Sequence, residues 1–167
     1  MVDRTENESF TKVVANAWNP ATGASDFTVY TKDGRILYFG SDPAGSLSQV
    51  IEPGSQIPVS WHLSGVVDRS PAGSGYAVTY INAPLADGVR DFRPSRIVYN
   101  NGSISVDFVY EKDQSNTLVA RRDAARVFRA GVKFSNPYRL IRLEIRQCSR
   151  LIRSYKLSYS YASDTST

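Results

Sequence analysis

The sequence predicts an all-β fold of successive antiparallel hairpins, arranged as an open or sandwich-like sheet. Three observations support this prediction. Apolar residues alternate with polar ones along most of the chain, which is the spacing of side chains on one face of a strand. Residues that favour turns separate the alternating runs. The 167 residues include 10 Tyr, 7 Phe and 2 Trp, side chains that are enriched in strands.

Two hairpins have the clearest turn signals. Residues 27–32 lead into Asp33-Gly34 and then into the apolar run 36–39. Residues 96–99 lead into Asn100-Asn101-Gly102 and then into the alternating run 104–110. Asp-Gly and Asn-Gly tolerate the positive φ that tight hairpin turns need. We therefore predict positive φ at Asn101 and Gly102.

Other stretches complete the expected fold. Residues 61–67 and 76–81 form one further strand pair, and residues 139–146 and 151–161 form another. Residues 41–58 are rich in proline and glycine, which indicates a loop with at most one short strand. Residues 118–130 fit a short helix and a strand equally well.

The predicted domain organisation has three parts. Residues 1–26 form an N-terminal lead-in with a short strand, residues 27–161 form the β-hairpin domain, and residues 162–167 form a polar tail. The last strands end in aromatic residues without a polar cap, so we expect an open sheet edge. Such an edge suggests a segment cut from a longer protein.

The charge is unevenly distributed. The net charge is +4, yet residues 112–156 carry twelve Lys and Arg against three acids, so this segment is +9 and the remainder is −5. We interpret the segment as a solvated arginine face rather than a docking surface for an acidic partner, and we expect no nucleic-acid binding. Because side chains alternate along a strand, Arg142 and Arg146 should lie on one face and Leu143 on the other. Arg153 interrupts an apolar row, so it should reach solvent or meet Glu144 across the hairpin.

The residues for nucleophilic or metal chemistry are few. Cys148 is the one cysteine and His62 the one histidine, so an internal disulfide and a thiolate metal cluster are excluded. A Cys148–His62 nucleophile pair needs the two residues to meet in space, and no orienting partner is evident. We predict no catalytic, metal or cofactor-binding residues, and hence no enzyme and no cofactor.

Carboxylates and tyrosines allow two further hypotheses. Two acids flanking a bond would suit a glycosidase, and the scattered candidates are Asp68, Asp87, Asp91 and Asp107. Most of these occur at turns, where Asp commonly caps backbone groups. Alternate tyrosines would also suit sugar stacking, although cross-strand packing is the favoured interpretation. Binding residues are therefore left unassigned.

Four stretches in order resemble one known family. They resemble its motifs V-x-x-K/R-D-G-x-x-x-x-Y/F-G, W-x-L-x-x-I-x-D with I-x-Y-x-Y, P-x-x-I-x-Y, and R-L-x-x-I followed by V-R-x-Y-x-L-x-Y. The matching stretches are residues 27–40, 61–69 with 76–80, 94–102, and 138–145 with 153–159. This order resembles the N-terminal region of Rhs (YD-repeat) proteins, insecticidal toxin-complex B components and Salmonella virulence plasmid B-type toxins.

The resemblance implies a structural role. In that family the strands wind into a hollow β shell around a toxic or variable C-terminal segment, and a β-propeller often follows. It implies a bacterial secreted protein whose partners are other segments of the same polypeptide or toxin-complex subunits. Residues 1–10 lack a signal-peptide core and no run reaches the ~20 apolar residues of a membrane span, so any export signal is expected outside this chain.

The chain also departs from the family pattern. A Gly-Asn turn is replaced by residues 69–75, and tyrosine-aspartate repeats are absent. The resemblance carries no catalytic residues across. The alternative function is a β-sandwich binding module for carbohydrate or a cell-surface partner.

Overall fold

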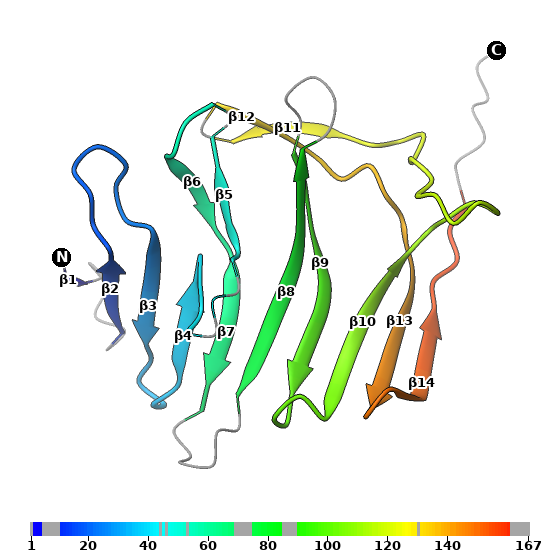
Figure 1. Ribbon diagram of the computed structural model, residues 1–167, viewed down its shortest axis with the longest axis horizontal. Helices are drawn as coiled ribbons and strands as arrows, with labels where there is room; N and C mark the ends of the chain where they lie inside the picture. The colour runs from blue at the N-terminus through cyan, green and yellow to red at the C-terminus, as the bar shows by residue number, and fades with distance from the viewer. Residues whose placement is uncertain are drawn as a thin grey trace.

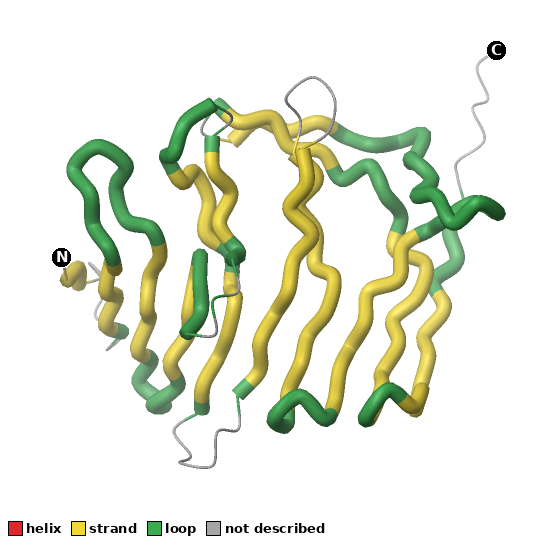
Figure 2. The backbone as a smooth tube through the Cα atoms, viewed as in Figure 1, coloured by secondary structure: helices red, strands yellow, loops and turns green. Residues whose placement is uncertain are grey.

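The computed structural model describes residues 2–4, 11–43, 45, 47–52, 54–68, 75–84, 90–129 and 131–160. It confirms the all-β prediction, with one twelve-stranded sheet and a separate two-stranded sheet (Figures 1 and 2). The strands are β1 (Val2–Arg4), β2 (Lys12–Asn16), β3 (Asp26–Tyr30), β4 (Ile36–Phe39), β5 (Gln49–Ile51), β6 (Pro58–Trp61), β7 (Leu63–Val67), β8 (Tyr76–Pro84), β9 (Arg90–Tyr99), β10 (Ile104–Tyr110), β11 (Arg126–Arg129), β12 (Val132–Ser135), β13 (Leu140–Gln147) and β14 (Arg150–Lys156).

The large sheet is a meander with two inserted hairpins. Its strand order is β1-β2-β3-β4-β7-β8-β9-β10-β13-β14, and each neighbouring pair on this path is antiparallel. The hairpins β5–β6 and β11–β12 leave the path between β4 and β7 and between β10 and β13. Figure 1 shows both hairpins at the same end of the strands. All four predicted strand pairs are present.

One strand pairing departs from the expected purely antiparallel pattern. β12 pairs with the beginning of β9 in parallel, through Phe134 opposite Arg90 and Ser135 opposite Asp91. β9 is ten residues long, but β10 pairs only with its last part, residues 96–99. The edge of the first part of β9 is therefore available, and the returning chain supplies β12 to it.

The two faces of the sheet differ in chemistry. Side chains alternate along each strand, so residues opposite one another in register share a face. One row runs through Val13, Val29, Leu37, Val66, Tyr76, Tyr99 and Ile104, and a second through Val78, Ile97, Val106 and Ile145. We call this side the apolar face. The opposite side, the polar face, carries Thr28, Tyr38, Gly65, Ala77, Arg96, Asp107 and Glu144.

The turns follow the sequence signals. Asn101 and Gly102 have φ of 51° and 83°, as predicted, and the Ser103 amide donates to the Asn100 carbonyl at 3.0 Å. Asn100 also has a positive φ of 51°. Gly34 has φ of 85°, in the left-handed region that a side chain disfavours. Both hairpins therefore close through residues that accept left-handed backbone.

Four segments differ from expectation. Residues 41–58 contain β5 and the start of β6, which pair as a hairpin, whereas at most one short strand was expected there. The expected strand 61–67 is interrupted at His62, because Trp61 turns its indole onto Gly40 while the His62 amide donates to the Ser48 carbonyl. Residues 118–130 form a loop followed by β11, with no helix among the described residues of that segment. The last strand ends at Lys156, and residues 157–160 are not in a strand. Tyr161 and Asp87 lie outside the described residues.

Few hydrophobic side chains are fully buried in the part of the chain that the structure describes. The buried hydrophobic residues are Ala24, Val50, Val66, Val78, Tyr110 and Val132. Most other members of the apolar face are only partly covered. The sheet is thus open, and much of its apolar face meets solvent.

Candidate functional site

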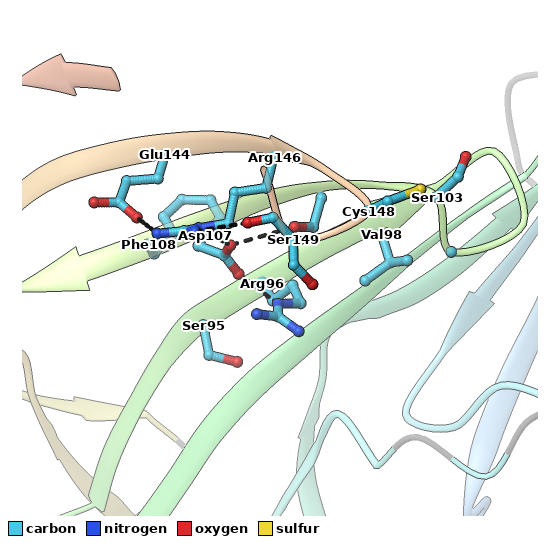
Figure 3. A pocket seen from close by; sticks show the side chains of 12 residues that line it. Ser95, Arg96, Val98, Ser103, Asp107, Phe108, Glu144, Arg146, Cys148 and Ser149 are labelled. Atoms are coloured by element: carbon cyan, nitrogen blue, oxygen red, sulfur yellow. Dashed lines mark hydrogen bonds and ion pairs between the residues drawn. The ribbon is translucent and has the colours of Figure 1, made fainter. Parts of the chain in front are cut away.

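The polar face forms a groove over β9, β10 and β13. Its volume is about 850 Å³. Figure 3 shows the side chains that line it. The groove is lined by Ser95, Arg96, Val98, Gly102, Ser103, Ser105, Asp107, Phe108, Glu144, Arg146, Cys148 and Ser149. Alternation along the strands brings the charged members to one side, because Asp107 opposes Arg96 on β9 and Glu144 on β13.

Ion pairs cross this groove from strand to strand. Arg96 pairs with Asp107. Arg146 lies between the two acids, with its Nε 3.5 Å from Asp107 Oδ2 and a terminal nitrogen 2.5 Å from Glu144 Oε2. Arg142 Nε lies 2.7 Å from the other Glu144 oxygen, Oε1. Three arginines thus hold two carboxylates, and Glu144 is 7% exposed beneath them.

These contacts decide what Asp107 and Glu144 can do. Side chains directly opposite on antiparallel strands have Cβ atoms about 4.5–5.5 Å apart, so the two carboxylates are close neighbours. However, the hydrogen bond from Arg146, assisted by the Arg142 charge, lowers the pKa of Glu144 below its usual value. A general acid needs the opposite shift. This arrangement suits cross-strand binding rather than proton delivery.

Asp91 is a buried structural residue. Arg93 Nε donates to both of its carboxylate oxygens at 3.0 Å, and the two side chains are 2% and 5% exposed. The Arg93 guanidinium lies 4.1 Å from the ring centre of Tyr110 and 4.7 Å from that of Tyr138. Burial raises the pKa of Asp91, while the hydrogen bonds from Arg93 oppose the rise. This cluster lies in the middle of β9, between its first residues, which pair with β12, and residues 96–99, which pair with β10.

The remaining sequence candidates lie apart from one another. Cys148 is exposed in the β13–β14 turn and lines the polar groove, whereas His62 lines a different hollow beside β6. The structure therefore does not bring the two together in one site. Asp68 follows the end of β7. Among the described residues, no group of three or more His, Cys, Asp or Glu is arranged to hold a metal ion.

The arginines of β13 and β14 follow the sequence expectation in part. Arg142 and Arg146 lie on the polar face, with side chains 45% and 34% exposed. Arg153 reaches outward and donates to the Tyr155 hydroxyl at 3.2 Å. The other suggested outcome, a contact between Arg153 and Glu144, is not found. Arg153 is paired with Ile145 and Glu144 with Ser154, so the two side chains lie on opposite faces of the sheet.

A second hollow lies between the two inserted hairpins. Its volume is about 390 Å³, and sequence reasoning missed it because its walls come from separate segments. It is lined by Ser60, His62, Phe92, Arg121, Asp123, Ala125, Val127, Phe134, Ser135 and Asn136. His62 was the one signal that pointed here, since it stacks on Phe92 with ring centres 4.1 Å apart.

Among the described residues there is no helix with the length and apolar character needed to cross a bilayer. No protein family and no curated protein matches the chain in sequence.

Several solved structures are similar in fold, including the following two. The N-terminal domain of the effector protein SpvB from Salmonella typhimurium strain LT2 superposes with a TM-score of 0.66 at 13% identity, covering 95% of this chain and 68% of that one. TcdB2-TccC3 superposes with a TM-score of 0.61 at 11% identity, covering 84% of this chain but only 8% of that one. The resemblance drawn from the sequence motifs is thereby confirmed for the fold: this chain has the fold of the SpvB N-terminal domain and of part of TcdB2-TccC3.

Proposed function

We propose that the chain is a non-catalytic structural segment of a secreted protein of the Rhs or toxin-complex type. In this role it contributes strands to a shell that encloses a toxic or variable C-terminal segment. The observation that carries the proposal is the apolar face of the sheet, where most side chains are only partly covered and Tyr76 is 39% exposed. A soluble monomer rarely leaves a contiguous apolar patch of this kind uncovered.

The outer strands support the same role. Every residue of β14 is exposed, and its large side chains Leu151, Ile152 and Tyr155 are 47%, 54% and 47% exposed. Among the described residues β14 pairs only with β13. An edge with exposed apolar side chains recruits further strands or covering segments. Other parts of the same polypeptide, or toxin-complex subunits, are the partners that this proposal assigns.

The charged residues support a scaffold rather than a catalyst. The described acids of the polar groove are held by arginines, and Asp91 is enclosed with Arg93. Ladders of cross-strand ion pairs fix strand register, which is what a wall made of strands requires. The proposed location outside the bacterial cell rests on the fold shared with the effector SpvB.

Oxidative footprinting of the apolar face tests the proposal. Hydroxyl radicals should label Tyr76 and Tyr99 in the isolated chain, where Tyr76 is 39% exposed and Tyr99 is only partly covered. The same residues should be protected in the native polypeptide that contains the chain. Tyr38 on the polar face is the internal control, and its labelling should change little. Equal labelling of Tyr76 and Tyr99 in both samples would refute the shell role.

Sedimentation of the isolated chain provides a second readout. Uncovered apolar surface and an open edge should make the chain associate as its concentration rises. A strictly monomeric species at all concentrations would count against the proposal. The alternative, a sandwich-type binding module, has less support because the large sheet has no second large sheet stacked on it among the described residues.

A further inference from the structure

The hollow between the inserted hairpins combines an aromatic floor with a polar rim. The ring centre of Phe92 lies 4.1 Å from that of His62 and 4.8 Å from that of Tyr80, with interplanar angles of 29° and 20°. Val127 of β11 lies opposite Phe134 of β12 and both line the hollow. The rings thus fix a firm apolar surface on the side of β9 and β12.

The rim carries a preformed ion pair. Arg121 donates from Nε to Asp123 Oδ1 at 3.0 Å and from a terminal nitrogen to Oδ2 at 2.7 Å, so the two planar groups are held in a fork. Their side chains are 30% and 49% exposed, so both groups can also reach a ligand. The hydrogen bond from Arg121 lowers the pKa of Asp123, which keeps the carboxylate ionised. Three Arg121 N–H groups remain beyond the two in the fork.

The chemistry of the rim selects against charged ligands. An anion that approached Arg121 would meet the Asp123 carboxylate, and a cation that approached Asp123 would meet the guanidinium. A hydroxyl both donates and accepts, so neighbouring hydroxyls can accept from Arg121 and donate to Asp123. The Ser60 hydroxyl is hydrogen-bonded to His62 Nε2 at 3.0 Å and the Ser135 hydroxyl donates to the Ala125 carbonyl at 3.3 Å, so both oxygens can still accept from a ligand. The Asn136 amide adds a further donor and acceptor to the lining.

We propose that this hollow binds a neutral saccharide, with sugar hydroxyls on the Arg121–Asp123 pair and an apolar sugar face against Phe92 and Phe134. A volume of about 390 Å³ lies within the range of small-molecule sites. Few polar groups at fixed positions beside an apolar surface are what such sites use for orientation. The site does not depend on the shell role, because its walls all belong to this chain.

Titration of the isotope-labelled chain with neutral disaccharides tests the proposal by nuclear magnetic resonance. The probes are maltose, cellobiose, lactose and diacetylchitobiose at millimolar concentration, with glucuronic acid and glucosamine as charged counter-probes. We expect at least one disaccharide to shift the amide signals of residues that line the hollow. The charged sugars should bind more weakly.

Two matched pairs of variants localise the binding. Arg121→Gln should weaken it about tenfold or more, since it removes charge-assisted hydrogen bonds. Arg35→Gln is the control, because Arg35 pairs with Asp33 in the same spacing on the β3–β4 turn. Val127→Ser should weaken binding as well, whereas Phe128→Ser should not, because neighbouring residues of a strand point to opposite faces. Val127 and Phe128 are 48% and 68% exposed, so the fold should tolerate both changes.

Three results would overturn the proposal. The first is the absence of any shift at the hollow with all four disaccharides. The second is equal loss of binding in Arg121→Gln and Arg35→Gln. The third is binding of glucuronic acid or glucosamine as tight as that of the neutral sugars.

Discussion

Replacing Gly40 by alanine should destabilise the protein far more than replacing Gly102 by alanine. Both glycines have positive φ, 91° and 83°, so both substitutions impose backbone strain of about 1–2 kcal/mol. Their surroundings differ. A Cβ at Gly102 would meet no atom within 4 Å, whereas a Cβ at Gly40 would lie 2.6 Å from Trp61 Cδ1 and 3.1 Å from the Ser25 carbonyl oxygen.

The Trp61 contacts set the additional cost. The indole nitrogen donates to the Ser25 carbonyl at 3.0 Å, and the ring meets Phe27 edge-on with ring centres 5.1 Å apart. An alanine at position 40 forces the indole away. That movement loses a hydrogen bond worth about 1 kcal/mol and an aromatic pair worth about 0.5–1.5 kcal/mol. We therefore expect about 3–4 kcal/mol for Gly40→Ala against about 1–2 kcal/mol for Gly102→Ala.

Urea unfolding of both variants measures the difference. Circular dichroism gives the free energy of unfolding, and tryptophan emission in a Trp18→Phe background isolates Trp61. Trp18 is already 56% exposed, so its removal should cost little. Emission of native Gly40→Ala should shift towards that of a solvated indole. Equal destabilisation by the two alanines, with unchanged emission, would refute the packing of the β5–β6 hairpin on Gly40.

Three other perturbations test the charged residues. Asp91→Asn should cost about 3–5 kcal/mol because it leaves Arg93 buried without its counter-charge, whereas Asp91→Leu with Arg93→Met should lie closer to wild type in thermal melting. Glu144 has a lowered pKa, so its contribution to stability is present above its usual value of 4.5 and is lost as pH falls through the lower folded value. The unfolding free energies of wild type and Glu144→Gln should therefore become equal at acid pH. A difference between the two free energies that stays constant with pH would contradict a stabilising role of the ion pairs. Filter binding should detect no oligonucleotide binding at physiological salt, and tight binding that weakens steeply with added salt would overturn our interpretation of the basic segment 112–156.

The strands could be predicted from the sequence because their signals are local. Alternation and the Asp33-Gly34 and Asn101-Gly102 turns specify hairpins without knowledge of distant residues. The β12–β9 pairing had no such signal, since parallel neighbours are joined by a long connection and not by a turn. Trp61 and His62 continue the expected strand in sequence, but the backbone of His62 is hydrogen-bonded to Gly40 and Ser48, which lie outside any strand and far away along the chain.

The candidate sites were less predictable than the strands. The position of Asp107 opposite Glu144 depends on register between β10 and β13, which form a pair only because the β11–β12 hairpin leaves the meander. The hollow beside His62 joins β6, β9 and the segment around Arg121, which are far apart in the chain. A tertiary arrangement of this kind leaves no spacing pattern in the sequence.

The parallel pairing of β12 with β9 also has a consequence for folding kinetics. The antiparallel hairpins close short loops and can form early, whereas β12 must return from far along the chain before it meets Arg90 and Asp91. Until it arrives, the first half of β9 presents an uncovered edge, and Asp91 and Arg93 remain accessible to water. This stage of folding is where intermolecular strand pairing competes most directly with the native fold.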